Sequence, residues 1–266
     1  MARGLGPLER AFLAWTQLRG LRSVRTGELR APLGLSAAEE RGLLSRMAQA
    51  GLIARVWRGL YLVPPRLPLG GRWTPGEALA LDALMRSRGA RYQVCGPNAF
   101  NRYGFDSQVP NRLYAYNDRL SEERTVGTIA MTLIKVASAR LGDTEEVTSA
   151  DGATIVYSSR ARTLVDAVYD WSRFNGLPRA FGWIRTELAA RRVAAAELAR
   201  VTLRYGDVGT VRRVGALLAR EGATDALLGR LRRRLRPTSA LIALDPTRPR
   251  RGTADGRWGV VWNERA

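Results

Sequence analysis

The first 63 residues carry apolar side chains first at the spacing of helices and then at the spacing of strands. In three successive segments the apolar positions recur every three or four residues, which predicts short helices over 7–19, 26–33 and 36–50. Thr26 is the predicted N-cap of the second helix, and Ser36 and Glu39 have the spacing of a capping box at the start of the third. The chain is therefore predicted to begin with three short helices.

A strand pattern follows the third helix. The runs 52–57 and 60–63 are strand-like, and only Arg58 and Gly59 lie between them. A two-residue connection that ends in Gly is typical of a hairpin turn, although Arg is a weaker first residue there than Asn. Three short helices and a hairpin together predict a winged helix-turn-helix over residues 1–66.

A stretch rich in proline and glycine at 67–75 is predicted to be a linker, because neither a helix nor a central strand tolerates this composition. A helical stripe over 76–88 follows it. Four strand-like runs come next, at 92–95, 113–116, 128–136 and 154–157. The region up to about residue 160 is therefore predicted to be mixed α/β.

Beyond residue 159 the apolar positions return to helical spacing. Pro178 is predicted to start one helix, and Thr210 and Thr224 to cap two later ones. The tail contains extended runs at 241–245 and 258–263. The predicted fold class is α+β, with the winged helix-turn-helix followed by a larger mixed α/β domain, 76–266, whose C-terminal part is mainly helical.

The charge of the chain suggests a class of partner. The 266 residues include 43 basic and 24 acidic side chains, for a net charge of +19, and Lys135 is the one Lys among the 43. The excess is uneven, at +7 over 1–70, +1 over 71–160 and +11 over 161–266. A high-GC genome explains why Arg replaces Lys, but it does not explain why basic side chains outnumber acidic ones. The surplus indicates a polyanionic partner, most simply nucleic acid.

Several residue types that carry chemistry are missing. The chain has no His and one Cys, Cys95. These counts exclude Ser-His-Asp and Cys-His catalysis, His-ligated metals, an internal disulfide and a Cys-rich zinc site. No run of 18 apolar residues is present, and the N-terminus lacks the apolar region of a secretory signal, so we expect a cytoplasmic protein. We predict no catalytic residue, metal or cofactor, and hence no enzyme.

The remaining candidates for chemistry have structural interpretations. Lys135 follows a strand-like run as a metal-nuclease lysine does, but Leu133 stands where that pattern needs an acid. Arg162 and Asp166 have the i, i+4 spacing of an ion pair on one helix, and Cys95 has the context of a small core residue. Two acidic pairs are interpreted as solvated loop charges: Glu122-Glu123 and Glu145-Glu146.

The winged helix supplies the candidate binding residues. Its third helix would enter the major groove and its hairpin would contact the flanking backbone or minor groove, where Arg and Gln can read base edges and Ser can hold a phosphate. The predicted DNA-binding residues are Arg22, Arg25, Ser36, Arg41, Ser45, Arg46, Gln49, Arg55, Arg58 and Tyr61. The alternative is a winged helix that contacts protein, with its arginines solvated.

Five segments in this order resemble the AbiEi antitoxins of type IV bacterial toxin–antitoxin systems, and the resemblance spans nearly the whole chain. The five segments lie at 51–61, at 95–104, at 162–166, at 205–215, and at 244–246 together with Arg257-Trp258 and Trp262-Asn263. In that family the first segment belongs to the winged helix and the last to the C-terminal end. One departure is Gly42 within the third helix, where Gly costs about 1 kcal/mol relative to Ala.

The resemblance implies a division of labour. The winged helix would bind inverted repeats in its own promoter and repress the operon. The C-terminal domain would counteract a cognate nucleotidyltransferase-like AbiEii toxin, directly or indirectly, in a system of phage defence. The family's DNA contacts carry over to Arg41, Ser45, Arg46, Arg55 and Arg58. The candidate residues for antitoxicity are Arg212, Arg213, Arg230, Arg233 and Arg234.

Two other classes of function stay open. The first is a winged-helix regulator or a basic RNA-binding protein, unrelated to a toxin. An RNA-binding protein would show stacking aromatics on an exposed sheet beside basic residues, so burial of the C-terminal tryptophans (Trp171, Trp183, Trp258 and Trp262) would weaken that hypothesis. An unusual nuclease or transferase would need clustered carboxylates. The acids that would have to converge are Asp106, Asp118, Glu122 and Asp143.

Overall fold

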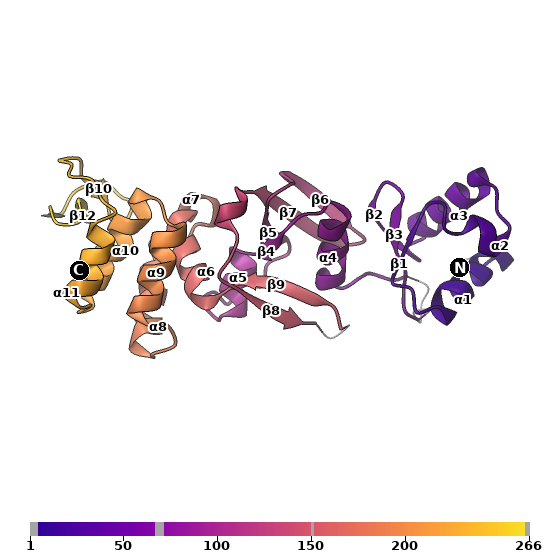
Figure 1. The fold of residues 1–266 in the computed structure, drawn as a ribbon, viewed down its shortest axis with the longest axis horizontal. Helices are drawn as coiled ribbons and strands as arrows, with labels where there is room; N and C mark the ends of the chain where they lie inside the picture. The colour runs from indigo at the N-terminus through magenta and orange to yellow at the C-terminus, as the bar shows by residue number, and fades with distance from the viewer. Residues whose placement is uncertain (1–4, 67–71, 150–151, 264–266) are drawn as a thin grey trace. The chain divides into compact units, whose positions relative to one another are not determined.

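The fold is described from a computed structural model over residues 5–66, 72–149 and 152–263 (Figure 1). Its contacts divide the chain into two units. The N-terminal unit comprises Met1–Tyr92, Asn111–Ser138 and Glu146–Ile155, and the C-terminal unit comprises Gln93–Pro110, Ala139–Glu145 and Val156–Ala266. The predicted linker starts with 67–71, which lie outside the described residues. Runs of helices and runs of strands follow one another along the described chain, which confirms the α+β class.

The N-terminal unit begins with a winged helix-turn-helix. Its helices are α1 (Pro7–Leu18), α2 (Arg30–Leu33) and α3 (Ala37–Gln49), and its strands are β1 (Ser23–Arg25), β2 (Ala54–Trp57) and β3 (Leu60–Leu62). The strands form an antiparallel sheet in the order β1-β3-β2. The side chains that close the core under this sheet include Phe12, Leu13, Val24, Leu29, Leu43, Leu44 and Met47. Burying these apolar side chains is what holds the short helices together, because helices of this length are marginal alone.

Two features of the winged helix differ from the prediction. The second helix begins at Arg30 with Leu29 at its N-cap, so Thr26 does not cap it. Residues 26–29 form a turn instead, in which Gly27 adopts a φ of 109° that L-residues rarely reach. The strand β1 was not predicted, because three residues are too short for an alternating pattern to stand out.

The rest of the N-terminal unit contains α4 (Glu77–Ser87), β5 (Leu113–Asn117), β6 (Glu122–Val126) and β7 (Ile129–Lys135). Strand β7 pairs parallel with β5 and antiparallel with β6. The full sheet has the order β6-β7-β5-β4-β9-β8, with β4 at Tyr92–Val94, β8 at Thr144–Thr148 and β9 at Thr154–Ser158.

The placement of the two acidic pairs in loops was wrong. Glu122 and Glu123 lie on β6, and Glu145 and Glu146 lie on β8. These strands are the two edges of the sheet, and most of their side chains are exposed or half-buried. Charged side chains are favoured on edge strands because they discourage pairing with other chains. The same charges removed the apolar signal on which a strand prediction depends.

The C-terminal unit is mainly helical, as predicted. Its helices are α5 (Pro97–Arg102), α6 (Arg160–Tyr169), α7 (Trp171–Phe174), α8 (Arg179–Ala189), α9 (Ala195–Tyr205), α10 (Val208–Arg220) and α11 (Asp225–Arg232). A small sheet follows, in the order β10 (Ile242–Ala243), β12 (Val260–Trp262), β11 (Thr253–Asp255). Thr224 caps α11 as predicted, whereas the N-cap of α10 is Asp207 and not Thr210.

A buried ion pair stands inside the C-terminal unit. Arg162 and Asp166 are one turn apart on α6, with 0% and 1% of their side chains exposed, and the guanidinium Nε donates to both carboxylate oxygens at 2.9 Å. The two guanidinium NH₂ groups donate to the carbonyls of Arg140 and Gly142. The predicted ion pair is therefore confirmed, and it also holds the loop before β8. Cys95 is buried, as expected of a core residue.

None of the helices in the described residues combines the length and the apolar character that crossing a membrane requires.

Candidate nucleic-acid interface

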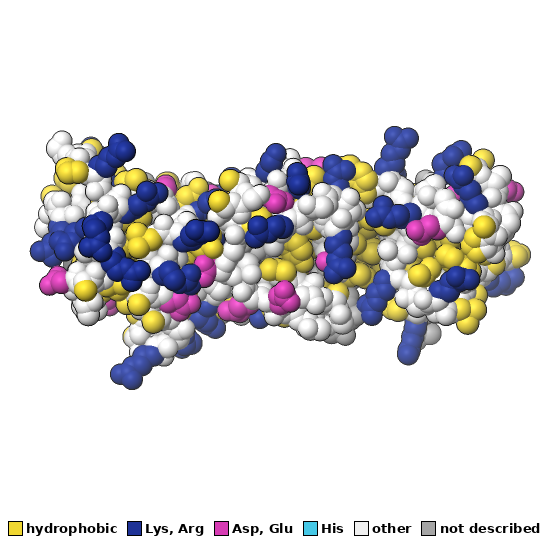
Figure 2. Space-filling model, in the orientation of Figure 1, with side chains coloured by type: hydrophobic (Ala, Val, Ile, Leu, Met, Phe, Trp, Pro, Cys, Tyr) yellow, Lys and Arg dark blue, Asp and Glu magenta, His cyan; other side chains and the backbone are white. Residues whose placement is uncertain are grey.

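The helix α3 separates its side chains into a buried and an exposed face. Leu43, Leu44 and Met47 are fully buried against the other elements of the winged helix. The predicted contact residues lie on the opposite side, and all four are exposed: Arg41, Ser45, Arg46 and Gln49. Arg41, Ser45 and Gln49 follow one another at four positions, and Arg46 precedes Gln49 by three, which is the helical repeat. On the face drawn in Figure 2, basic side chains spread over these elements with few acidic ones between them.

The start of α3 is fixed by two carboxylates. The predicted capping box is present, with the Ser36 hydroxyl accepting from the Glu39 N–H and the Glu39 carboxylate accepting from the Ser36 N–H. Next to it, the fully buried carboxylate of Glu40 accepts from the N–H groups of Gly27 and Leu29 at 2.7 and 3.0 Å. Arg30 Nε donates to its other oxygen at 3.1 Å. Glu40 thus joins α3 to the turn before α2.

Sequence reasoning missed the role of Glu40, although a signal was present. Its position continues the buried stripe of Leu43, Leu44 and Met47 at helical spacing, and a carboxylate there needs partners. Burial by itself raises the pKa of Glu40, but hydrogen bonds from the backbone of Leu29 and Gly27 and from Arg30 outweigh it and lower the pKa. The carboxylate therefore stays charged in the folded winged helix.

The hairpin of the wing projects two of the predicted arginines. Gly59 has a φ of 79°, as the turn requires, and its carbonyl accepts from the Thr26 N–H at 2.9 Å. Arg55 and Arg58 are exposed. In the described residues, neither of them nor Arg41 nor Arg46 has an acidic oxygen within 4.0 Å, so their charges are available to a ligand.

Tyr61 has to be removed from the predicted contact set. Its side chain is only 8% exposed and belongs to the core of the winged helix. The cause is the pairing of β3, which lies between β1 and β2 and carries three buried residues in succession. Both faces of β3 are therefore buried.

Three other predicted contacts lie nearby. Arg22 and Arg25 flank or belong to β1, Ser36 begins α3, and all three are exposed. Ser36 combines this exposure with its capping role. Arg22 and Arg25 help to line a cavity of about 500 Å³ in the N-terminal unit, together with Arg86 of α4.

Trp57 of β2 ties the wing to the remainder of the N-terminal unit. The centroid of its ring lies 3.9 Å from the Arg124 guanidinium carbon and 4.4 Å from that of Arg88. Arg124 also donates to the Val56 carbonyl at 3.2 Å and to the Glu122 carboxylate at 2.8 Å. Such cation–π contacts contribute about 0.5–1 kcal/mol each at exposed sites and more when desolvated. Sequence reasoning missed this contact, because Arg88 and Arg124 lie far from Trp57 along the chain.

Gly42 gains an explanation from the position of Arg46. The helix α3 continues through Gly42 without a break. A Cβ atom at this position would lie 3.1 Å from the Arg46 Nη1. The missing side chain thus leaves space on the exposed face of α3 for the guanidinium of a predicted DNA contact.

Two of the candidates for antitoxicity are structural residues. Arg212 is only 8% exposed and donates to the Ala240 carbonyl at 3.1 Å. Arg213 donates to the carbonyls of Ala243 and Leu244, and burial lowers its pKa. Both arginines therefore hold the chain around β10 against α10. The other three candidates are exposed: Arg230, Arg233 and Arg234.

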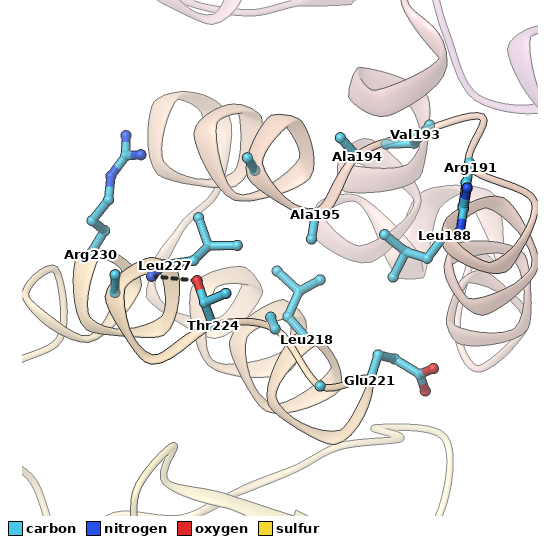
Figure 3. A pocket seen from close by; sticks show the side chains of 14 residues that line it. Leu188, Arg191, Val193, Ala194, Ala195, Leu218, Glu221, Thr224, Leu227 and Arg230 are labelled. Carbon is cyan, nitrogen blue, oxygen red and sulfur yellow. Dashed lines mark hydrogen bonds between the residues drawn. The ribbon is translucent and has the colours of Figure 1, made fainter.

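An apolar groove lies beside Arg230 in the C-terminal unit (Figure 3). Its volume is about 810 Å³, and it is lined by the ends of α8 and α10 and the starts of α9 and α11. In Figure 3, Leu188, Leu218 and Leu227 line its middle, while Arg230 and Arg191 stand toward opposite sides. Arg230 of α11 thus borders an apolar surface.

The acids that an enzyme would need are each engaged separately. Asp106 pairs with Arg179, Glu122 with Arg124, and Asp143 with Arg200, while Asp118 accepts from the Arg91 N–H. Within residues 5–66, 72–149 and 152–263, no three acidic or Cys side chains are grouped so that they could hold a metal ion.

The C-terminal tryptophans do not form an exposed stacking surface. Trp258 is 1% exposed, and Trp171, Trp183 and Trp262 are half-buried. Burial of one of the four tryptophans therefore leaves the hypothesis of an RNA-binding protein open.

Comparisons with known proteins agree with the winged helix. Residues 18–64 match a family model described as "Transcriptional regulator, AbiEi antitoxin". A search of curated proteins finds no match. Among solved structures, the crystal structure of the RV2827C protein from Mycobacterium tuberculosis matches with a TM-score of 0.62 and 14% sequence identity, over 97% of this chain and 92% of that one. At this identity the likeness shows a shared fold.

Proposed function

We propose that the chain binds inverted repeats in its own promoter and represses it. The proposal starts from the match of residues 18–64 to the AbiEi-antitoxin family of transcriptional regulators. One observation carries this proposal. The exposed face of α3 and the tip of the wing present Arg41, Arg46, Arg55 and Arg58 without acidic partners in the described residues. A helix with Arg and Gln on one face is the element that reads a major groove, and a basic wing suits the phosphates beside it.

The DNA-binding half is tested by separating base contacts from phosphate contacts. With DNA from upstream of its own gene, Arg46→Ala is expected to weaken binding about tenfold to a hundredfold and to relax the sequence preference. Arg58→Ala should weaken binding to all sequences alike and reduce the slope of log affinity against log salt by about 0.9. Fluorescence anisotropy over a range of salt concentrations measures both effects.

The matched control is Arg119→Ala, since Arg119 is exposed in the same unit but lies outside the winged helix. Its affinity and salt slope should equal those of the unchanged protein. Equal losses in Arg119→Ala and Arg46→Ala, or binding that does not respond to salt, would show that the protein carries no DNA reader at this surface.

We further propose that the C-terminal unit counteracts a nucleotidyltransferase-like AbiEii toxin, as a type IV antitoxin acting in the cytoplasm and in phage defence. The apolar groove of Figure 3 and the arginines of α11 support this proposal. The floor is apolar, Arg191 and Arg230 stand at its sides, and the one acid of the lining, Glu221, pairs with Arg185. Such a groove suits a protein segment that has apolar side chains on one face and carboxylates beside them. The net charge of +11 over 161–266 favours an acidic partner in the same way.

Full-length variants distinguish the two activities. Replacing Arg230, Arg233 and Arg234 by Glu should abolish rescue of cells that express the neighbouring toxin, because the sign of charge beside the groove is reversed. Promoter binding by this variant should stay within about twofold of the unchanged protein. Arg46→Ala combined with Arg58→Ala should show the opposite pattern, with rescue kept and promoter binding lost. Full rescue by the triple Glu variant would refute the assignment of antitoxicity to this surface.

A further inference from the structure

A second, smaller cavity lies in the C-terminal unit, apart from the groove of Figure 3. Its volume is about 180 Å³. It is enclosed by α10, by the end of α11 with the turn after it, and by the turn between β11 and β12. Four of its lining residues are arginines, namely Arg212, Arg232, Arg236 and Arg257, and none of the ten is acidic. We call this cavity the arginine pocket.

Arg212, the most buried of the four arginines that line the pocket, has no counterion in the described residues. The residue is more than nine-tenths buried, and the Ala240 carbonyl accepts one of its N–H groups. Within the described residues no carboxylate lies within 4.0 Å of it. A charge removed from water without a paired charge is costly, so a site of this kind gains stability when an anion enters.

The walls of the pocket are shaped around that guanidinium. Gly259 has a φ of 66°, and a Cβ atom there would lie 3.3 Å from the Arg212 Cζ. The indole Nε1 of Trp258, another lining residue, is buried and has no hydrogen-bond partner among the described residues. Asp255, the nearest acid along the turn, is engaged by the N–H groups of Arg257 and Trp258. The pocket thus holds unused donors and no free acceptor of opposite charge.

The size of the pocket suits a small oxyanion. A volume of 180 Å³ equals that of about six water molecules at roughly 30 Å³ each, which is room for one tetrahedral anion and a few waters. Planar guanidinium groups bind phosphate oxygens through paired N–H donors, and several such groups around one point select a dianion over chloride.

We propose that the arginine pocket binds a phosphate group, either as inorganic phosphate or as the terminal phosphate of a nucleoside phosphate. This site is separate from the DNA-binding surface and from the groove beside α11, and it does not depend on the function proposed above. Arg212 is the buried donor, and Arg232, Arg236 and Arg257 complete the site at the mouth. Their charges also account for part of the C-terminal excess.

The proposal is tested by calorimetric titration of the full chain with inorganic phosphate and, separately, with AMP. Ionic strength is held constant, and titration with chloride serves as the comparison. One saturable site is expected. Replacing Arg236 and Arg257 together by Gln should weaken it about tenfold or more, since a charge-assisted hydrogen bond is lost from each. Arg212→Gln should abolish binding, and the surface double variant covers the case in which that buried change alters folding. Tighter binding of AMP than of phosphate would identify the source as a nucleoside phosphate, and equal affinity would identify free phosphate.

The matched control replaces Arg233 and Arg234 by Gln, because these arginines lie in the same run but do not line the pocket. Binding should then stay within about twofold. Arg46→Ala with Arg58→Ala should also keep the site, which separates it from the DNA-binding surface. The proposal is overturned if neither phosphate nor AMP shows saturable binding, or if the control pair weakens binding as much as the pocket pair.

Discussion

Replacing Glu40 by Ala is expected to lower the free energy of unfolding of the winged helix by about 3–5 kcal/mol and to abolish promoter binding. The change removes the acceptor of two buried N–H groups, those of Gly27 and Leu29, and leaves Arg30 without its partner. Each buried donor left without an acceptor costs about 1–3 kcal/mol. The helix α3 and the turn before α2 then lose the contact that sets their relative position.

Urea denaturation followed by far-UV circular dichroism measures this effect, together with the anisotropy titration on promoter DNA. The control is Glu39→Ala, which removes the neighbouring carboxylate on the exposed side. Its loss should be much smaller, because only one capping hydrogen bond at the exposed start of α3 is removed. If Glu40→Ala cost no more than Glu39→Ala, the buried carboxylate would not be what organises the winged helix.

The same carboxylate gives the winged helix a dependence on pH. Because the folded pKa of Glu40 lies below its unfolded value of about 4.3, its contribution to stability is fully present above that pH. The contribution is lost as the pH falls through the lower folded pKa. Acid unfolding of Glu40→Gln should therefore show a smaller change in stability below pH about 4 than the unchanged protein does.

Replacing Asp166 by Ala is expected to lower the free energy of unfolding of the C-terminal unit by about 3–5 kcal/mol. Arg162 has no exposed side-chain surface, so its charge would remain inside the unit without a counterion. Arg140, which also donates to Asp166 and has one buried nitrogen without a partner, would lose its acidic neighbour. The residual carbonyl contacts of Arg162 do not neutralise its charge.

The chain contains a matched control for this prediction. Asp82 and Arg86 have the same i, i+4 spacing on α4, but 26% and 78% of their side chains are exposed. Asp82→Ala should cost only about 0.3–0.5 kcal/mol, because exposed helical pairs contribute little. Urea midpoints of the two variants, at unchanged slope, give the comparison. Similar midpoints would mean that burial of the Arg162–Asp166 pair has no energetic consequence.

The parts of the fold that follow from local sequence were the parts that could be predicted. The apolar stripe, the capping box at Ser36 and the Gly at position 59 of the hairpin are all local, and they were enough to recognise the winged helix and the exposed face of α3. The i, i+4 pair of Arg162 and Asp166 was recognisable for the same reason. Its complete burial was not, because burial depends on which helices pack over α6.

The errors share a physical cause, which is tertiary context. Tyr61 was expected on the open face of the hairpin, but β1 pairs with the other side of β3, and the whole of β3 is buried. From the sequence, Arg212 and Arg213 were interpreted as part of a basic surface. In the structure the chain around β10 covers them and accepts their hydrogen bonds. The partners of Trp57 come from α4 and β6, and no local pattern connects such distant segments.

The setting of Trp57 has a consequence for the kinetics of binding. The guanidinium groups of Arg88 and Arg124 hold the ring of Trp57, so the wing is ordered in the free protein. Little conformational entropy then remains to be lost when DNA binds. If the winged helix reads DNA as proposed, such a preorganised surface should bind in one step, at a rate set by encounter and electrostatic attraction. Association should then be fast and dependent on salt, and the lifetime of the complex should carry the discrimination between operator and other DNA.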